Sequence, residues 1–120
     1  MEAQGQTKKL FISLPVNGRS TEEVRRAWSK AVMEMKEYLE EDFEIIDSFI
    51  EDPPSHDVIH ESLWYLGRSL QFLADADIAY FSQGWDQARG CIIENMVAQR
   101  YGIEFVTYGK YLDEKGIVDD

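Results

Sequence analysis

The feature that most constrains the fold is an alternation of short apolar runs with longer segments whose apolar residues recur at helical spacing. The runs KKLFISLPV (8–16) and DIAYF (77–81) have the length and hydrophobicity of buried strands. FEIIDSFI (43–50) and IEFVTY (103–108) fit the same pattern. Because strands covered on both faces read as continuous apolar runs, the alternation predicts a parallel sheet between two layers of helices.

Two amphipathic helices are expected in the first two thirds of the chain. Ser20 and Glu23 form a capping-box pattern, which predicts a helix from Thr21 to about Glu41. The loop 51–57 contains two prolines, and a second helix is expected at about 58–74. The first helix repeats apolar side chains on one face, namely Val24, Ala27, Trp28, Ala31, Val32, Met35 and Leu39.

A third helix is expected within 84–102, and GKYLDEKGI (109–117) fits a last helical turn. With 120 residues the chain is expected to form one domain, residues 1–120, with an ordered core at about 8–112 and polar tails. The predicted fold is an α/β, three-layer αβα domain. Its mostly parallel sheet would have four or five strands, as in the flavodoxin-like or Rossmann-like group. Such sheets bind ligands at the carboxyl ends of their strands.

Charge and composition limit the classes of partner. A formal net charge of −11 disfavours duplex nucleic acid, although one Arg and a helix N-terminus can hold a small nucleotide. No apolar run approaches the length of a membrane span, and neither a membrane span nor a signal peptide is expected. The single cysteine fits a reducing cytoplasm. Neither a metal nor a cofactor is expected.

The segment SLPVNGR (13–19) follows the first predicted strand and leads into the capped helix. Ser13 and Asn17 are expected to donate hydrogen bonds to a ligand, and Arg19 to bind its phosphate or ribose beside the helix N-terminus. Pro15 and Gly18 would shape this turn. The alternative is an ordinary strand-to-helix turn with a solvated Arg, since no complete glycine fingerprint is present.

Glu94 is the most unusual residue of the third predicted helix. At about 100° per residue it falls between Ala98 and Tyr101, among small and apolar side chains, where a charge needs a partner or a function. Gly90, one turn earlier, would let a ligand approach. Glu94 is therefore a candidate base or nucleophile. The alternative is a Glu bonded to backbone or to Arg89.

Aromatic side chains are candidates for stacking on a base. Trp85 lies between Gly84 and Asp86 directly after a predicted strand, where a loop faces a ligand. Trp64 and Tyr65 offer the same chemistry from the second helix. The alternative for each is an ordinary place in the core.

His56 and His60 have the spacing of two zinc ligands on one helix face. No third ligand is obvious, and the preceding prolines disfavour a helix at His56, so surface histidines are the better interpretation. Cys91 has only Arg89 as a nearby base and is interpreted as a buried structural thiol.

Several of these segments together resemble the nucleoside 2-deoxyribosyltransferase-like superfamily, and most closely a small branch from phages and bacteria. The resemblance covers residues 8 to about 107 and is carried by FISLPVNGR, RSLQFLADADIAYF and GWDQARGCIIENMVAQRYGIEFV. The matching positions are Gly18, Arg19, Asp77, Gly84, Trp85, Arg89, Gly90, Glu94 and Ala98. The resemblance implies cleavage or transfer of an N-glycosidic bond. It also implies Glu94 as the nucleophile, Trp85 as a wall for the base and Arg19 as a 5′-phosphate contact.

One position departs from the superfamily pattern. Members carry an Asp eight residues before the Asp of the third strand, but here the residue eight before Asp77 is Ser69. A serine cannot act as a carboxylic general acid, so Asp86 or Asp57 would have to replace it. The resemblance further implies a homo-oligomer in which the tail YLDEKGIVDD (111–120) reaches a neighbouring copy.

The sequence thus leads to three hypotheses. The first is an enzyme that hydrolyses or transfers the N-glycosidic bond of a nucleoside or nucleotide, with Glu94 as nucleophile. The second is a nucleotide-binding module without catalysis, which Ser69 favours. The third is a structural oligomer that has lost the ligand.

Overall fold

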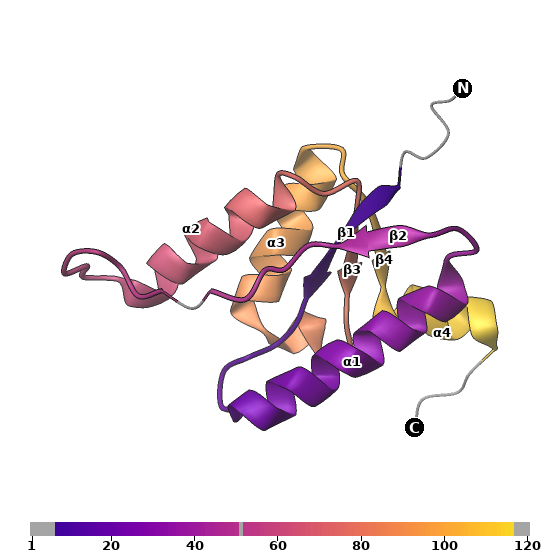
Figure 1. Ribbon diagram of the computed structural model, residues 1–120, viewed down its shortest axis with the longest axis horizontal. Helices are drawn as coiled ribbons and strands as arrows, with labels where there is room; N and C mark the ends of the chain where they lie inside the picture. The colour runs from indigo at the N-terminus through magenta and orange to yellow at the C-terminus, as the bar shows by residue number, and fades with distance from the viewer. Residues whose placement is uncertain (1–6, 51, 117–120) are drawn as a thin grey trace.

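A computed structural model describes residues 7–50 and 52–116 and shows a four-stranded, all-parallel sheet between two layers of helices (Figure 1). The strand order is β2-β1-β3-β4, which confirms the predicted α/β sandwich. The strands are β1 (Lys8–Ser13), β2 (Phe43–Ile45), β3 (Ile78–Phe81) and β4 (Glu104–Thr107).

Within residues 7–50 and 52–116, four α-helices cover the sheet, with α1 and α4 packed on one face and α2 and α3 on the other (Figure 1). The predicted capping box is present, because the Ser20 side chain accepts from the backbone of Glu23 and the Glu23 side chain accepts from that of Ser20. No helix in the described part of the chain has the length and apolarity needed to cross a membrane. The helices are α1 (Thr21–Tyr38), α2 (Glu61–Leu73), α3 (Arg89–Arg100) and α4 (Tyr108–Lys115), with a 3₁₀ turn η1 (Trp85–Gln87) before α3.

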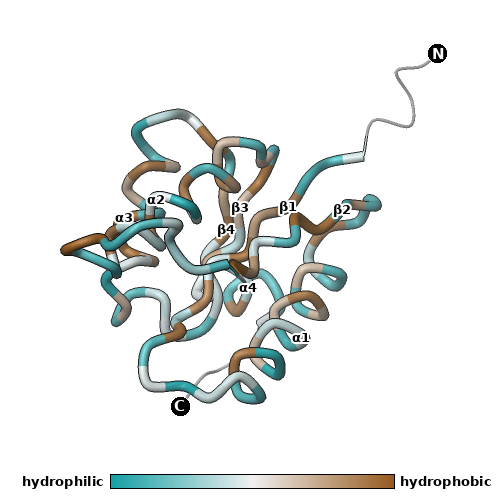
Figure 2. The backbone as a smooth tube through the Cα atoms, turned by 60° about the vertical axis from the view of Figure 1, so that its left-hand side comes forward, coloured by the Kyte–Doolittle hydropathy of each residue, from teal (hydrophilic) through white to brown (hydrophobic). Residues whose placement is uncertain are grey.

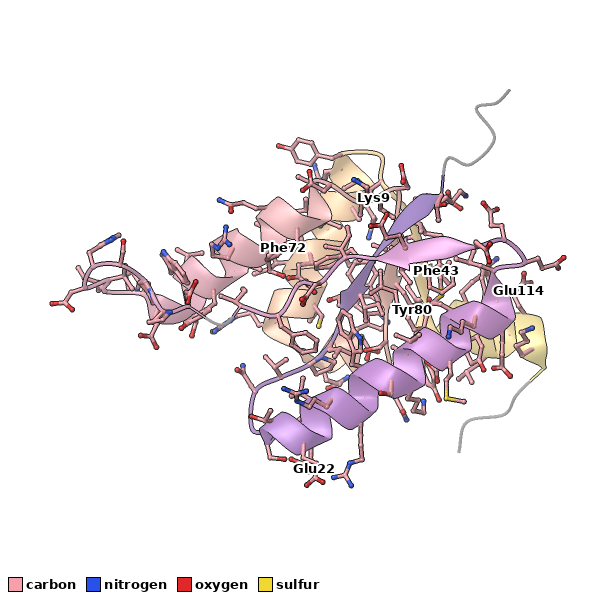
Figure 3. All side chains as sticks on the ribbon, viewed as in Figure 1. Lys9, Glu22, Phe43, Phe72, Tyr80 and Glu114 are labelled. Carbon is pink, nitrogen blue, oxygen red and sulfur yellow. The ribbon has the colours of Figure 1, made fainter. Side chains whose placement is uncertain are left out.

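The core has two halves because side chains alternate along each strand. Leu10 and Ile12 of β1 pack toward α1 and α4, whereas Phe11 packs toward α2 and α3. Tyr80 lies between the sheet and α1 (Figure 3) and is fully buried. Figure 2 shows the apolar character of the central strands against the mixed character of the helices.

The main boundary differences from the prediction lie at β2, at the start of α2 and at α4. β2 ends at Ile45 rather than at residue 50. Among the strands of the described residues it pairs with β1 alone, and its last contact with that strand is the bond from Ile46 N–H to the Leu10 carbonyl. α2 begins at Glu61, because its first backbone bonds are accepted by the His60 carbonyl. The last helical turn is a full helix, α4, whose side chains join the core.

The order in which successive strands are added to the sheet reverses between β1 and β3. The chain passes from β1 to β2 on one side and then crosses to β3 on the other side. In open parallel sheets, ligands bind at the carboxyl ends of the two strands flanking such a reversal. Here those ends are Ser13 and Phe81, and Ser82 donates from both its backbone N–H and its hydroxyl to the Ser13 carbonyl.

Candidate active site at the carboxyl ends of the central strands

The centre of the site is the carboxylate of Glu94, which is 6% exposed. Its Oε1 accepts a hydrogen bond of 2.6 Å from the Ser13 hydroxyl, and its Oε2 accepts one of 2.5 Å from the Ser69 hydroxyl. The carboxylate therefore does not turn out to solvent. In the described part of the chain, these two hydroxyls donate to the carboxylate and no ion pair joins it to Arg89.

The fold brings these three residues together from three elements. Ser13 is the last residue of β1 and shares the strand face of Phe11, which looks toward α2 and α3. Glu94 lies in the second turn of α3, on a buried face that also contains Cys91 and Ala98. Ser69 reaches the carboxylate from the neighbouring helix α2. The Glu94 carboxylate therefore lies beside the carboxyl end of β1.

Burial raises the pKa of the Glu94 carboxyl above its ordinary value of 4.5, because the charged form loses solvation. The hydrogen bonds from Ser13 and Ser69 oppose this rise, since hydroxyl donors stabilise the carboxylate. Each carboxylate oxygen has two lone pairs, so one bond from serine leaves each oxygen able to meet a ligand. Glu94 is thus a buried carboxylate with remaining capacity to bind or react.

Cys91 lies close to this group but is not a reactive thiol. Burial, the largest effect, raises its pKa to about 11, and the Glu94 charge acts in the same direction. The Ser13 hydroxyl and the Arg19 charge act in the opposite direction, which places Arg19 close enough to influence the site. A thiol with this pKa stays protonated at neutral pH, as expected for a structural cysteine.

The turn after β1 presents polar groups to solvent at this end of the sheet. Arg19 donates its backbone N–H to the Val16 carbonyl over 3.2 Å, which closes the turn. Gly18 has φ of 78°, a conformation that favours glycine. Asn17 and Arg19 are exposed, so their side chains are free to meet a ligand from outside.

The loop after β3 lies against this turn. Gly84 has φ of 88°, and a Cβ at this position would lie 3.4 Å from the Cγ of Pro15. Trp85 is half-buried, and its ring packs against Phe81 with 5.6 Å between centroids. One side of Trp85 therefore belongs to the core between the sheet and α3. Asp86 is exposed on η1.

The start of α3 is open. Its N-cap is Ala88, and in the described part of the chain no side chain caps its first amides. Arg89 is exposed there, and a Cβ built on Gly90 would meet nothing within 4 Å. The structure thus leaves space at the position where the sequence predicted a gap beside Glu94, and unpaired amides at a helix start favour anions.

The two histidines do not meet at the site. His56 and His60 both precede α2 and are exposed, so they do not share a helix face. Asp57 is exposed in the same loop. In the range that the structure describes, no group of three or more His, Cys, Asp or Glu side chains is placed to hold a metal ion.

Asp77, which the resemblance singled out, lies at the opposite edge of the sheet. Its Oδ2 accepts a 2.8 Å hydrogen bond from the backbone N–H of Lys9, and its own N–H bonds to the Lys9 carbonyl. Asp77 is thus a structural link between the amino ends of β1 and β3.

A second buried carboxylate, Glu34 on α1, was not predicted. It is 6% exposed and lies on the other face of the sheet. It accepts from the Tyr80 hydroxyl over 2.7 Å and pairs with Lys30 over 2.5 Å. Lys30 also donates to the Gln83 side chain over 3.2 Å. The spacing of Lys30 and Glu34 by four residues was the available sequence signal.

The described part of the C-terminal tail packs on its own chain. Tyr111 is buried and its hydroxyl donates to the Glu37 carboxylate, while Lys115 donates to the Glu37 carbonyl over 2.7 Å. This contact raises the pKa of Tyr111 to about 12, chiefly through the Glu37 hydrogen bond. Residues 111–115 therefore belong to α4, which packs on its own chain, and 117–120 lie outside the described residues. The contact of this tail with a neighbouring copy stays a prediction.

Comparisons with protein-family models, with curated protein sequences and with solved structures give no match to this chain. The resemblance drawn from the motifs stays a prediction. The geometry around Glu94 supplies the grounds for a functional proposal.

Proposed function

We propose that the protein is a nucleoside or nucleotide N-glycosidase or 2-deoxyribosyltransferase in which Glu94 is the nucleophile. The observation that carries the proposal is the Glu94 carboxylate, buried at the carboxyl ends of the central strands and held by two serine hydroxyls. A buried carboxylate without a cation partner is costly, and such groups concentrate at functional sites.

The proposed reaction has two steps. A Glu94 oxygen forms a bond to the anomeric carbon while the bond from that carbon to the base nitrogen breaks, and the electron pair leaves with the base. The departing nitrogen takes a proton from water. Water, or the hydroxyl or amine of an acceptor, then attacks the anomeric carbon, loses a proton and releases the Glu94 carboxylate.

The surroundings of Glu94 support a nucleotide ligand. Exposed Arg19 provides a charge for a 5′-phosphate, and the open start of α3 provides amide donors on the same side of the sheet. The space at Gly90 allows a ligand to approach the helix one turn before Glu94. In this proposal Asn17 and Ser13 orient the sugar.

The test is a panel of ribo- and deoxyribonucleosides and their 5′-monophosphates, with released base separated by chromatography. We expect one class of substrate to release base, and a 2-fluoro-2-deoxy analogue to leave a glycosyl ester on Glu94 that peptide mass spectrometry locates. An ester on another residue, or release without any dependence on Glu94, contradicts the assignment.

A second function is favoured by one observation. Ser69 occupies the position of the expected carboxylic acid and donates to Glu94, so no acid is present there to protonate a leaving base. The alternative is a nucleotide-binding module that senses or sequesters its ligand. It predicts that a nucleotide raises the melting temperature of the wild type without base release, and that Ser69→Asp gains base release on the same scaffold.

The proposal includes a homo-oligomer in the cytoplasm. Large apolar side chains are exposed on or beside α2 and α3, and Leu63 is 62% and Met96 52% exposed. Burial of such side chains between copies would be favourable. Sedimentation velocity tests this part, and a monomer at micromolar concentration contradicts it.

A further inference from the structure

A cavity of about 420 Å³ opens between the segment that follows β2 and the first turns of α2. Figure 1 shows this segment running from the end of β2 toward the start of α2. Ligand pockets in proteins usually enclose about 300–1,000 Å³, so the cavity has room for one flat heterocycle. Helix α2 links the cavity to the Glu94 site through the chain, because Arg68 of the cavity wall directly precedes Ser69, which donates to Glu94.

Two aromatic rings from different elements line the cavity. Phe49 comes from the segment after β2 and Trp64 from α2. Phe49 is 42% exposed, yet its ring is supported by Trp28 of α1, with 4.7 Å between the centroids. Trp64 is half-buried and packs edge-on against Tyr65, with centroids 4.9 Å apart. Each of the two aromatic walls is thus held in place by a neighbouring ring. Aromatic walls held in this way suit the stacking of a planar ring between them.

Polar groups of opposite charge complete the lining. Arg68 is half-buried, its guanidinium lies 5.5 Å from the centroid of the Phe72 ring, and it donates to Gln71. Asp52 faces the same cavity from the opposite segment. No ion pair joins Asp52 to Arg68 within the described ranges, so each keeps hydrogen-bonding capacity for a ligand.

We propose that this cavity binds the base of the nucleotide and selects guanine. Guanine offers two adjacent acceptors, O6 and N7, that match the forked donors of an Arg, and it offers N–H donors that a carboxylate accepts. Adenine carries an amino donor where guanine has the O6 acceptor, so a hydrogen-bond donor of the base would face the donors of the Arg68 guanidinium. The inference rests on the proposed function for its choice of a nucleotide, and it adds the base and the residues that recognise it.

Binding is measured by titration calorimetry on Glu94→Gln protein, which removes turnover, with GMP, AMP and ribose 5-phosphate as ligands. We expect GMP to bind at least tenfold more tightly than AMP, and ribose 5-phosphate to bind more weakly than either. In the same background, Trp64→Ala should weaken GMP binding at least tenfold, and Arg68→Gln should abolish the preference for GMP.

The matched aromatic control is Tyr101→Ala, since Tyr101 is 79% exposed at the far end of α3 and should leave GMP binding unchanged. Equal GMP affinity in Trp64→Ala, Arg68→Gln and Tyr101→Ala overturns the proposal, as does equal binding of ribose 5-phosphate and GMP. If Trp64→Ala fails to fold by circular dichroism, Arg68→Gln and Phe49→Leu decide the question, because neither side chain is fully buried.

The two proposals fail in different ways. If wild-type protein binds GMP through Trp64 and Arg68 but releases no base, the cavity assignment stands and the glycosidase is wrong. If wild-type protein releases base from nucleotides but Arg68→Gln leaves the KM values for guanine and adenine substrates unchanged, the glycosidase stands and the cavity assignment is wrong.

Discussion

Two glutamates in the described part of the chain are equally buried but have different surroundings, one on each face of the sheet. Glu34 and Glu94 are each 6% exposed, and each accepts two side-chain hydrogen bonds. A cation supplies one of the bonds to Glu34, from Lys30 at 2.5 Å. Both bonds to Glu94 come from neutral serine hydroxyls. The two carboxylates are therefore equally buried, but a positive charge neutralises only that of Glu34.

The presence or absence of a cation affects the pKa values of Lys30 and Glu94. Burial alone would lower the pKa of Lys30, but the hydrogen bond and charge of Glu34 raise it above the usual value. Lys30 is therefore held in its charged form beside the Glu34 carboxylate. Burial raises the pKa of Glu94, and the serines only reduce that rise. A compensated carboxylate stabilises structure, whereas an uncompensated one is available for chemistry.

The largest predicted effect is on catalysis. Glu94→Gln keeps the shape of the side chain but removes the nucleophile, so kcat for base release should fall by about 10³-fold or more. The matched control is Glu34→Gln, a buried glutamate on the opposite face, which should keep kcat within a few fold. Equal losses in the two variants would show that Glu94 acts through folding alone.

The second predicted effect is on stability, where Glu34→Gln should cost more than Glu94→Gln. Glu34→Gln breaks the pair with Lys30, which should lower the free energy of unfolding by about 1–2 kcal/mol, because the Lys30 side chain is half exposed. Glu94→Gln removes an uncompensated charge and should leave stability equal or higher at pH 7. Urea denaturation of both variants provides the measurement, and a larger loss in Glu94→Gln refutes the contrast.

The third prediction concerns pH. The folded pKa of Glu94 is raised above 4.5, so the folded state binds more protons than the unfolded state as pH rises from there. Wild-type stability should therefore decline relative to Glu94→Gln above pH 4.5 and level off once Glu94 is ionised. Thermal unfolding between pH 4 and pH 8 tests this, and parallel curves for the two proteins would contradict it.

The fourth change is smaller and concerns the serines. Ser69→Ala removes a hydrogen bond that opposes the rise in the Glu94 pKa, so the pKa should move further up. The acidic limb of kcat/KM should shift to higher pH, by about one unit for each ~1.4 kcal/mol of lost stabilisation of the carboxylate. An unchanged limb would show that another group controls the acidic side of the profile.

The smallest effect is expected at Gly90. Gly90→Ala meets no atom within 4 Å, so it should stabilise α3 by up to about 1 kcal/mol. The added methyl group should nevertheless lower kcat/KM if a ligand uses that space. Gly67→Ala in α2, which also meets nothing within 4 Å, is the matched control with unchanged kcat/KM.

The sequence predicted the layers of the fold because the relevant signals are local. Continuous apolar runs marked the four strands, and the capping box at Ser20 marked the start of α1. The end of β2 was wrong by several residues, because pairing with β1 rather than local composition ends it at Ile45. The start of α2 was also misplaced, since the backbone at His60 departs from helical geometry.

The site was predictable only in part. Helical spacing placed Glu94 toward the interior, which the structure bears out. Its serine partners come from residues 81 and 25 positions away in the chain, so only the assembled sheet brings them together. Glu34 was missed because the i,i+4 spacing to Lys30 reads as an ordinary surface pair, and its burial under Tyr80 is a tertiary effect.

The Asp77 link at the amino edge has a consequence at the opposite edge. By holding the Lys9 N–H, it fixes which residue of β1 stands beside which residue of β3. A slip by one position would turn each β1 side chain to the other face and point the Ser13 hydroxyl at α1 instead of Glu94. The Asp77 carboxylate, at the amino end of the strands, therefore fixes the register that aligns Ser13 with Glu94 at their carboxyl end.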